Sequence, residues 1–367
     1  RHNGGGLFYY KGLNTNNNNT FSSKAAFWDG GGIYMEESNT NFSNNIFSGN
    51  FSDEDGGAIF ILSGKNSFIE NVISGNSASW DGGGIYAEHG ENFFTKNEFL
   101  ENITIDFDGG GVFLYNGLNT FDNNKFLKDT ADYGGGIYIE EGMTTLLNNE
   151  FSENFAFNGG GIYSEQATTT ITKNIITKNV SEEGGGVFID DGNNNISENE
   201  IIENYALDGG GLYISEGTNN LFNNEFSQNQ ASDYGGAIFI VNGTNVWINN
   251  LIKGNSSYYG GGIYSYFGSN IFLNNVFSGN DAEEGGAFYT ESSIDTLTNN
   301  TFGGNLATVG GGMYLFEGST TSISNSIFWG NGSEIYNDSG MLSTLTVSNS
   351  IIQNGIIGCV SCPGGDG

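Results

Sequence analysis

The chain has 367 residues, including 60 Gly, one Pro and two Cys, and its 42 acidic and 10 basic residues give a net charge of −32. So few cations argue against nucleic-acid binding, which needs Lys and Arg to neutralise phosphates, and against docking on anionic membranes. No run of 18 or more apolar residues is present, so we expect no membrane insertion. Abundant Phe, Ile, Tyr and Thr favour strands over helices.

A glycine cluster followed by an aliphatic and an aromatic residue recurs thirteen times, as in Gly134–Tyr138. Seven of the twelve intervals between copies are 25 residues, four are 26 and one is 27. A fixed period of this size indicates stacked repeats, each of which buries its apolar face only against its neighbours. We predict a single domain over residues 1–354 and a Gly-rich tail over residues 355–367.

Alternation with a period of two predicts a strand directly after each glycine cluster. The aliphatic fourth residue is expected to face the core and the aromatic fifth residue to face outward, with aromatic rings stacked inside as the alternative. An exposed aromatic stripe usually marks an interaction surface, for sugars, a second chain or a flanking domain, unless the rings stack and shield one another. The aromatic ladder consists of Phe8, Tyr34, Phe60, Tyr86, Phe113, Tyr138, Tyr163, Phe188, Tyr213, Phe239, Tyr264, Tyr289 and Tyr314.

A polar turn and two further short strands complete each repeat. In one copy the apolar residues Leu146 and Phe151 alternate with Asn149 and Asn154, and the same pattern recurs along the chain. Asn can hydrogen-bond its own backbone at a corner, and stacked copies can bond to one another. The sequence therefore predicts an all-β, right-handed parallel β-helix, a solenoid of about 13–14 coils of ~25 residues with three short strands per coil.

An acidic residue often precedes the glycine cluster. Carboxylates ~5 Å apart on successive coils would repel one another by about 1 kcal/mol or more. Bound Ca²⁺ would relieve that repulsion, whereas the simpler interpretation is that Asp-Gly is a favourable turn pair. The possible calcium ligands are Asp29, Asp55, Asp81, Asp108 and Asp208.

Gly235–Ile238 together with Phe226–Asn229 carries both motifs of a known repeat, G-G-A-[ILV] and F-x-x-N. The pairing, once per coil, resembles the repeats of chlamydial polymorphic outer-membrane proteins and, more widely, of bacterial surface proteins with parallel β-helix repeats. Asn325–Asn331 is similar to the last coils of surface-anchored members. The resemblance implies a β-helix on a cell surface. Most copies here read Gly-Gly-Gly and none of the repeats contains Cys, so the outer-membrane role is not carried over.

The acids recur in coil after coil, whereas a catalytic site breaks a repeat once, and no repeat carries a long insertion that could wall a cleft. We therefore predict no enzyme but a non-catalytic extracellular structural or adhesive surface protein, a rigid stalk or a fibre-forming subunit. The alternatives are a glycan-binding module and a polysaccharide lyase or hydrolase. The chain starts on a repeat without a capping helix, so the expected partners are other copies, head to tail or laterally, or surface glycans.

Two kinds of covalent modification are also predicted. Cys359 and Cys362 in the tail are expected to form a local disulfide. Asn-x-Ser/Thr sequons, which could carry glycans outside a cell, begin at Asn18, Asn41, Asn50, Asn102, Asn179, Asn195, Asn242, Asn255, Asn299, Asn331 and Asn337.

Overall fold

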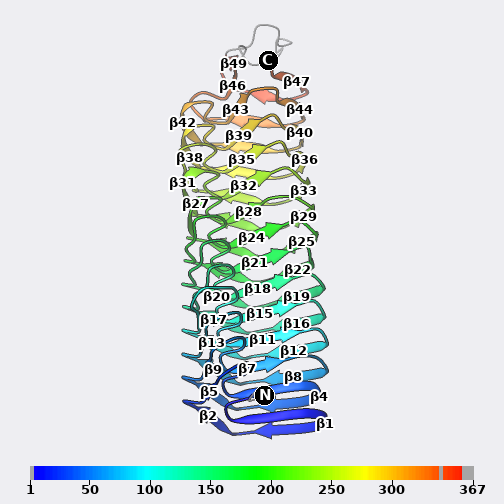
Figure 1. Cartoon of the computed structure of the whole chain (residues 1–367). Helices are drawn as coiled ribbons and strands as arrows, with labels where there is room; N and C mark the ends of the chain where they lie inside the picture. The colour runs from blue at the N-terminus through cyan, green and yellow to red at the C-terminus, as the bar shows by residue number, and fades with distance from the viewer. Residues whose placement is uncertain (1–3, 339–341, 358–367) are drawn as a thin grey trace. The chain divides into compact units, whose positions relative to one another are not determined.

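A computed structural model describes residues 4–338 and 342–357 of the chain, and these residues form strands, turns and loops but no helix. The chain divides into two compact units, Arg1–Ser181 and Glu182–Gly367. In each unit short parallel strands stack coil upon coil (Figure 1). The coils number about 14 and have about 25 residues each, as predicted. Cys359 and Cys362, the predicted disulfide pair, lie outside the described residues.

The first unit contains strands at four places in its coils. First strands follow the glycine clusters: β1 (Leu7–Asn17), β4 (Ile33–Ser43), β7 (Ile59–Ile61), β11 (Ile85–Glu88), β15 (Val112–Tyr115), β18 (Ile137–Glu140) and β21 (Ile162–Glu165). Second strands, which β1 and β4 include in their own length, are β8 (Lys65–Ile69), β12 (Glu91–Thr95), β16 (Leu118–Asp122), β19 (Met143–Leu147) and β22 (Thr168–Thr172). Third strands are β2 (Thr20–Ser22), β5 (Ile46–Ser48), β9 (Val72–Ser74), β13 (Glu98–Leu100), β17 (Lys125–Leu127), β20 (Glu150–Ser152) and β23 (Ile175–Thr177). Fourth strands are β3 (Ala25–Ala26), β6 (Phe51–Ser52), β10 (Ser77–Ala78) and β14 (Ile103–Thr104).

The second unit repeats the arrangement. Its first strands are β24 (Val187–Asp190), β28 (Leu212–Ile214), β32 (Ile238–Val241), β35 (Ile263–Tyr266), β39 (Phe288–Glu291), β43 (Met313–Phe316), β46 (Ile335–Asn337) and β49 (Ile356–Ile357). Its second strands are β25 (Asn193–Ser197), β29 (Thr218–Phe222), β33 (Thr244–Ile248), β36 (Ser269–Leu273), β40 (Ile294–Thr298), β44 (Thr320–Ser324) and β47 (Thr344–Ser348). Its third strands are β26 (Glu200–Ile202), β30 (Glu225–Ser227), β34 (Leu251–Lys253), β37 (Val276–Ser278), β41 (Thr301–Gly303), β45 (Ile327–Trp329) and β48 (Ile351–Ile352). Its fourth strands are β27 (Tyr205–Asp208), β31 (Gln230–Tyr234), β38 (Asp281–Glu284) and β42 (Leu306–Val309).

Equivalent strands pair in parallel with a register of one coil. Ile137 of β18, for example, lies opposite Ile162 of β21, and Met143 of β19 lies opposite Thr168 of β22. Because side chains of a strand alternate between its two faces, this register places like residue above like residue through each unit. The three predicted strands per coil are confirmed, and the fourth short strand is an addition that the sequence pattern did not predict.

The core of each unit consists of stacked columns of apolar side chains. Ile137 and Ile139 are fully buried, as the alternation predicts. The Phe residues of the second and third strands stack ring on ring, with centroids 4.3 Å apart for Phe94 and Phe121 and 4.6 Å apart for Phe126 and Phe151. Full burial of such a side chain contributes roughly 1.5–3 kcal/mol, and the contribution recurs in every coil.

Buried Asn side chains form two continuous ladders at the corners that flank the third strands. Nδ2 of Asn149 donates to Oδ1 of Asn174 at 3.0 Å and to the carbonyl of Phe121 at 3.0 Å. Its Oδ1 accepts from the backbone N–H and from Nδ2 of Asn124. The amide thus bonds the coil before it and the coil after it, which satisfies a polar group that burial would otherwise penalise. The predicted structural role of these Asn residues is confirmed.

A third ladder of buried side chains runs through the second strands. Nδ2 of Asn66 donates to Oδ1 of Asn92 at 3.1 Å, and Nδ2 of Asn92 donates to Oδ1 of Asn119 at 3.0 Å. In the second unit Nδ2 of Asn270 donates at 2.8 Å to Asp295, which also accepts from the Thr290 hydroxyl. Sequence analysis did not predict this ladder, because Thr replaces Asn in several coils.

One carboxyl group occupies an amide position of a ladder. Asp129 is completely buried where other coils have Asn, and its Oδ1 accepts from Asn102 as an Asn oxygen would. Its Oδ2 stands in the place of the donating Nδ2 and has no hydrogen-bond partner among the residues that the structure describes. Burial raises the pKa of Asp129 well above its usual range. A protonated carboxyl restores the missing donor, so the neutral acid fits this position and the carboxylate does not.

Replacement of Asp129 by Asn is expected to raise the free energy of unfolding at pH 8 by about 2 kcal/mol, since it restores a donor at a buried position. The difference in the free energy of unfolding between the variant and the parent chain should become smaller toward pH 4. The folded-state pKa of Asp129 is raised, so the penalty for this group grows as the pH rises above the ordinary Asp pKa of about 3.9. Urea unfolding at the two pH values measures both effects. Asn124→Asp, in the neighbouring ladder, is the matched control and should show the opposite sign; a destabilising Asp129→Asn contradicts this account.

Candidate functional site

The predicted aromatic ladder exists as a stack of rings. In the first unit successive rings from Phe8 to Tyr163 lie nearly parallel, as for Tyr86 and Phe113 with centroids 5.0 Å apart and planes at 3°. In the second unit Phe239 is turned edge-on to Tyr213, and the ladder gains one more ring, Tyr336, beyond Tyr314. The alternation of the first strands directs these rings away from the aliphatic core.

The expectation that this ladder is an exposed interaction stripe is wrong for most of its length. Phe8 is 48% exposed and Tyr86 is half-buried. In several coils the segment that precedes the glycine cluster packs against the ladder: Tyr133, for instance, packs its ring edge on against Tyr163, with centroids 5.4 Å apart, and Tyr234 packs in the same way against Tyr264. The buried members of the ladder are Tyr34, Phe60, Phe113, Tyr138, Tyr163, Phe188, Tyr213, Phe239, Tyr264, Tyr289 and Tyr314.

Two of the buried Tyr residues donate their hydroxyl groups to carboxylates on the next coil. The hydroxyl of Tyr138 donates to Glu165, and the hydroxyl of Tyr264 donates to Glu291. Burial, followed by these carboxylates, raises the pKa of both phenols far above the usual range. Glu165 and Glu291, the last residues of β21 and β39, are therefore engaged by structural phenols.

The acids that precede the glycine clusters cap the next coil. Oδ1 of Asp55 accepts from the backbone N–H of Asp81 at 3.1 Å, and Oδ1 of Asp81 accepts from that of Asp108 at 3.0 Å. Burial raises the pKa of Asp29, Asp81 and Asp208 to about 6, that of Asp55 to about 7 and that of Asp108 to about 8. In the second unit Oδ1 of Asp208 accepts from the backbone N–H of Tyr234 at 3.2 Å.

These five carboxylates do not form the predicted calcium site. Asp29, Asp55, Asp81, Asp108 and Asp208 each belong to a different coil, and within the described residues no three His, Cys, Asp or Glu side chains gather in a group that could hold a metal ion. The repulsion that motivated the calcium hypothesis is relieved in another way, because the raised pKa values allow part of the column to be protonated near neutral pH. The hydrogen bonds of Asp55, Asp81 and Asp208 run to the backbone of the next coil, so these carboxylates link neighbouring coils.

The sequons separate into two groups by burial. Asn18, Asn41, Asn195 and Asn299 are exposed, and Asn242 is half-buried, so these five stay possible glycan acceptors. The rest are buried, most of them as rungs of the corner ladders; Nδ2 of Asn102, for example, donates to Asp129 and to the carbonyl of Ile73. A glycan cannot be joined to an amide nitrogen that is enclosed in this way, which corrects the prediction for Asn50, Asn102, Asn179, Asn255, Asn331 and Asn337.

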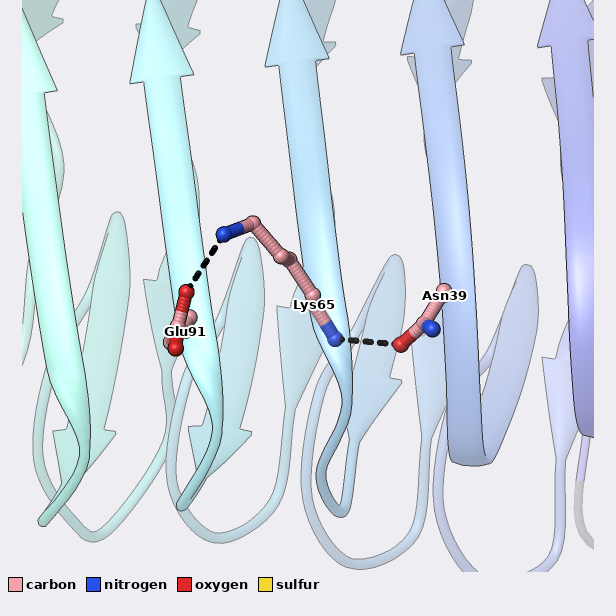
Figure 2. A network of polar contacts seen from close by, with 3 residues as sticks. All are labelled: Asn39, Lys65 and Glu91. Atoms are coloured by element: carbon pink, nitrogen blue, oxygen red, sulfur yellow. Dashed lines mark hydrogen bonds and ion pairs between the residues drawn. The ribbon is translucent and has the colours of Figure 1, made fainter.

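A groove of about 480 Å³ in the first unit crosses β1, β4, β8 and β12. Its lining consists of Leu13, Asn14, Thr15, Asn39, Asn41, Lys65, Asn66, Ser67 and Phe93. Figure 2 shows Lys65 between Asn39 and Glu91: its backbone N–H donates to Oδ1 of Asn39 at 2.8 Å and its Nζ lies 2.7 Å from Oε2 of Glu91. Nζ also lies 5.3 Å from the ring centre of Phe93.

The chemistry of this groove suits a neutral polar ligand. Amides and hydroxyls supply donors and acceptors, Phe93 supplies one partly exposed ring, and the ammonium group of Lys65 is already paired with a carboxylate. Glycoside hydrolysis in its usual form needs two carboxyl groups on either side of the scissile bond, and none of the described residues that line the groove is an acid. The groove can therefore bind, but its lining provides no acid–base pair.

A second hollow, of about 530 Å³, lies in the second unit. Its lining comprises Ser256, Ser257, Tyr258, Asp281, Ala282, Glu283, Leu306, Ala307 and Thr308. Asp281 and Glu283 are two residues apart on β38 and both are exposed. Both carboxyl groups are open to water, whereas the catalytic acid of a glycosidase is usually sheltered from it.

A column of exposed and half-buried side chains, which was not predicted, stands two residues before the glycine clusters. In the first unit this column, here called the loop column, consists of Trp28, Glu54, Trp80, Phe107, Asp132 and Phe157. Its four aromatic members are 45–54% exposed. The constant offset from the glycines was visible in the sequence, but the mixture of aromatic and acidic residues concealed it.

A family model described as a right-handed β-helix region matches residues 1–130 and, again, residues 83–256. The two matches together cover residues 1–256, more than half of the chain, and agree with the predicted hand. Neither the search of curated proteins nor the search of solved structures found a match. The described residues include no helix with the length and apolarity that a membrane crossing requires.

Proposed function

Since the chain belongs to the right-handed β-helix family, we propose that it is a non-catalytic structural and adhesive segment of an extracellular surface protein. The observation that carries the proposal is the hydrogen bonding of the ladders from coil to coil. The buried Asn amides bond the neighbouring coil in coil after coil, and several Asp carboxylates and Tyr hydroxyls do the same. Residues that hold the stack together in this way are scaffold, and function is left to the exposed side chains.

Three further features support the proposal. The two hollows are shallow, and only the one in the second unit has acids in its lining, which are exposed. The net charge of −32 keeps a secreted protein soluble and apart from anionic surfaces. The motifs at Gly235–Ile238 and Phe226–Asn229 resemble those of bacterial surface proteins. Partners that fit this role are surface glycans or, for a fibre-forming subunit, other copies of the chain.

We expect no turnover of polysaccharides by the full chain. Incubation with neutral and with acidic polysaccharides, with and without Ca²⁺, should release no reducing ends and no unsaturated uronate above the blank. A glycosidase and a lyase known to be active on the same batches serve as controls. Sustained product formation that Glu283→Gln abolishes would contradict the proposal and place an active site in the hollow of the second unit.

Labelling of intact source cells with an antibody against the chain tests its location. Signal on the outer surface is expected, and signal restricted to the cell interior would overturn the extracellular assignment. Electron microscopy of the same cells and of the purified chain distinguishes isolated molecules from filaments, and hence a stalk or adhesive segment from a fibre-forming subunit.

A further inference from the structure

We infer that the loop column of the first unit binds one chain of a neutral, extended β-1,4-linked polysaccharide. The inference deepens the proposed function, because it names the ligand class of the adhesive surface. It rests on the exposure of Trp28, Trp80, Phe107 and Phe157, on their spacing, and on the carboxylates between and beside them.

The spacing of the column is set by backbone hydrogen bonds. The N–H of Glu54 donates to the carbonyl of Trp28 at 3.2 Å, and the N–H of Trp80 donates to the carbonyl of Glu54 at 3.2 Å. Trp28 and Trp80 are 52 residues apart in sequence, yet only two coils separate them, or ~9.6 Å at the usual strand spacing. Phe107 and Phe157 are linked in the same way through Asp132, with bonds of 2.8 and 2.7 Å.

This period matches the repeat of an extended β-1,4-linked chain. In such a chain each sugar is rotated by half a turn relative to the sugar before it, so every second ring presents the same face. Each sugar also lengthens the chain by close to one strand spacing. Trp28 and Trp80 stand two coils apart, as do Phe107 and Phe157, so the two aromatic side chains of each pair can stack against every second sugar ring. Between the pairs, Trp80 and Phe107 stand in adjacent coils, with ring centroids 6.1 Å apart and planes at 52°, so the register holds within a pair and shifts by one ring from one pair to the next. An α-linked chain coils and cannot keep that register over several rings.

The acids of the column suit the rims of the same sugars. Glu54 lies between Trp28 and Trp80, and Asp132 lies between Phe107 and Phe157; both are partly exposed. A carboxylate accepts hydrogen bonds from hydroxyl groups. In an extended β-1,4-linked chain the hydroxyl groups lie at the edges of each sugar, whereas the aromatic side chains stack against its faces. Aromatic faces with acceptors between them meet both the apolar faces and the polar edges of a sugar chain.

Charge distinguishes a neutral glycan from the other occupants. A net charge of −32 repels acidic polysaccharides, and it also repels a second copy of the same chain that would have to bring its own carboxylates to this surface. Exposure of several aromatic side chains to water is unfavourable in free energy unless a ligand covers them, which is the reason to expect a ligand at the loop column.

The test uses the full chain with swollen cellulose and with cello-oligosaccharides as probes, followed by tryptophan fluorescence and by depletion from solution. Cellohexaose should bind at least roughly tenfold more tightly than cellobiose, because only the longer probe reaches both Trp28 and Trp80. Trp28→Ala combined with Trp80→Ala should weaken cellohexaose binding by roughly tenfold or more, and replacement of both residues by Tyr should retain most of it. Amylose should not bind.

Phe267→Ala and Trp329→Ala are matched controls, since both remove a partly exposed aromatic residue elsewhere, and they should change the affinity by less than about twofold. Circular dichroism confirms that each variant is folded. Equal binding by the double alanine variant, equal binding of amylose, or no binding of cellohexaose at millimolar concentration would overturn the inference. So would a dimer in sedimentation that the double variant dissociates, which would make a second copy the occupant. Release of new reducing ends from the bound glucan would instead contradict the proposed function while leaving the binding site intact.

Discussion

Replacement of Gly31 by Ala should lower the free energy of unfolding by about 3 kcal/mol, close to the upper end for overpacking in a core. A Cβ at this position would lie 2.2 Å from the carbonyl oxygen of Gly57 and 2.4 Å from that of Phe51, both of which are backbone atoms of the next coil. Neither atom can withdraw without opening the stack. Thermal and urea unfolding of the full chain measure the loss.

Gly32→Ala is the matched control, one residue away in the same cluster. There the added Cβ would approach one backbone oxygen, that of Ala58, at 2.8 Å, and the next atom is 3.6 Å away. Alanine occurs naturally at the equivalent third position in Ala58, Ala237 and Ala287. A loss below about 1 kcal/mol is therefore expected, and equal losses for the two variants would show that the close approach of neighbouring coils does not require Gly31.

Stability should fall as the pH rises from about 4 to about 8, by on the order of 4 kcal/mol in total. The pKa values of Asp81, Asp55 and Asp108 are raised to about 6, 7 and 8, chiefly by burial. Between the ordinary Asp pKa and these values the folded chain binds more protons than the unfolded chain, so the slope of the free energy of unfolding against pH is negative. Above about pH 8 this contribution should level off.

Unfolding midpoints at pH 5 and pH 8.5 measure this dependence. Because the other acids of the chain also repel one another more strongly at high pH, the specific contribution is isolated by Asp55→Asn together with Asp108→Asn. An Asn oxygen still accepts from the next coil, as Asp55 accepts from Asp81, but it does not titrate. The variant should lose much of the dependence on pH, and a midpoint that rises with pH in the parent chain would refute the assignment.

The stacking fold was predictable because its signals repeat. Leu146, Asn149, Phe151 and Asn154 occupy fixed places in a 25-residue period, so a single alignment of the copies yields the core columns and the corner ladders. The third ladder was not predictable in this way, since Thr144 stands in one coil where Asn119 stands in the coil before it.

The candidate surfaces were harder to predict, because exposure depends on what covers a residue. Alternation indicated that the ring of Tyr163 leaves the core, but not that Tyr133, thirty residues earlier, packs over it. The sequon at Asn102 matches the motif of a glycan acceptor, yet the same side chain is a rung of a buried ladder. In both cases the local pattern was interpreted correctly, but contacts with the neighbouring coil bury the side chain.

The ladders also have a polarity. In the first unit Nδ2 of Asn45 donates to Asn71, Nδ2 of Asn71 donates to Asn97, and each amide oxygen is held in place by a second donor, the backbone N–H of the preceding rung. No amide can rotate by half a turn alone, because its reversed oxygen and nitrogen would face like groups on both sides. The aligned side-chain dipoles therefore add up along the stack as peptide dipoles do in an α-helix. They give the interior of the first unit, whose described residues form no helix, a permanent electrical direction that runs from its early coils to its late ones.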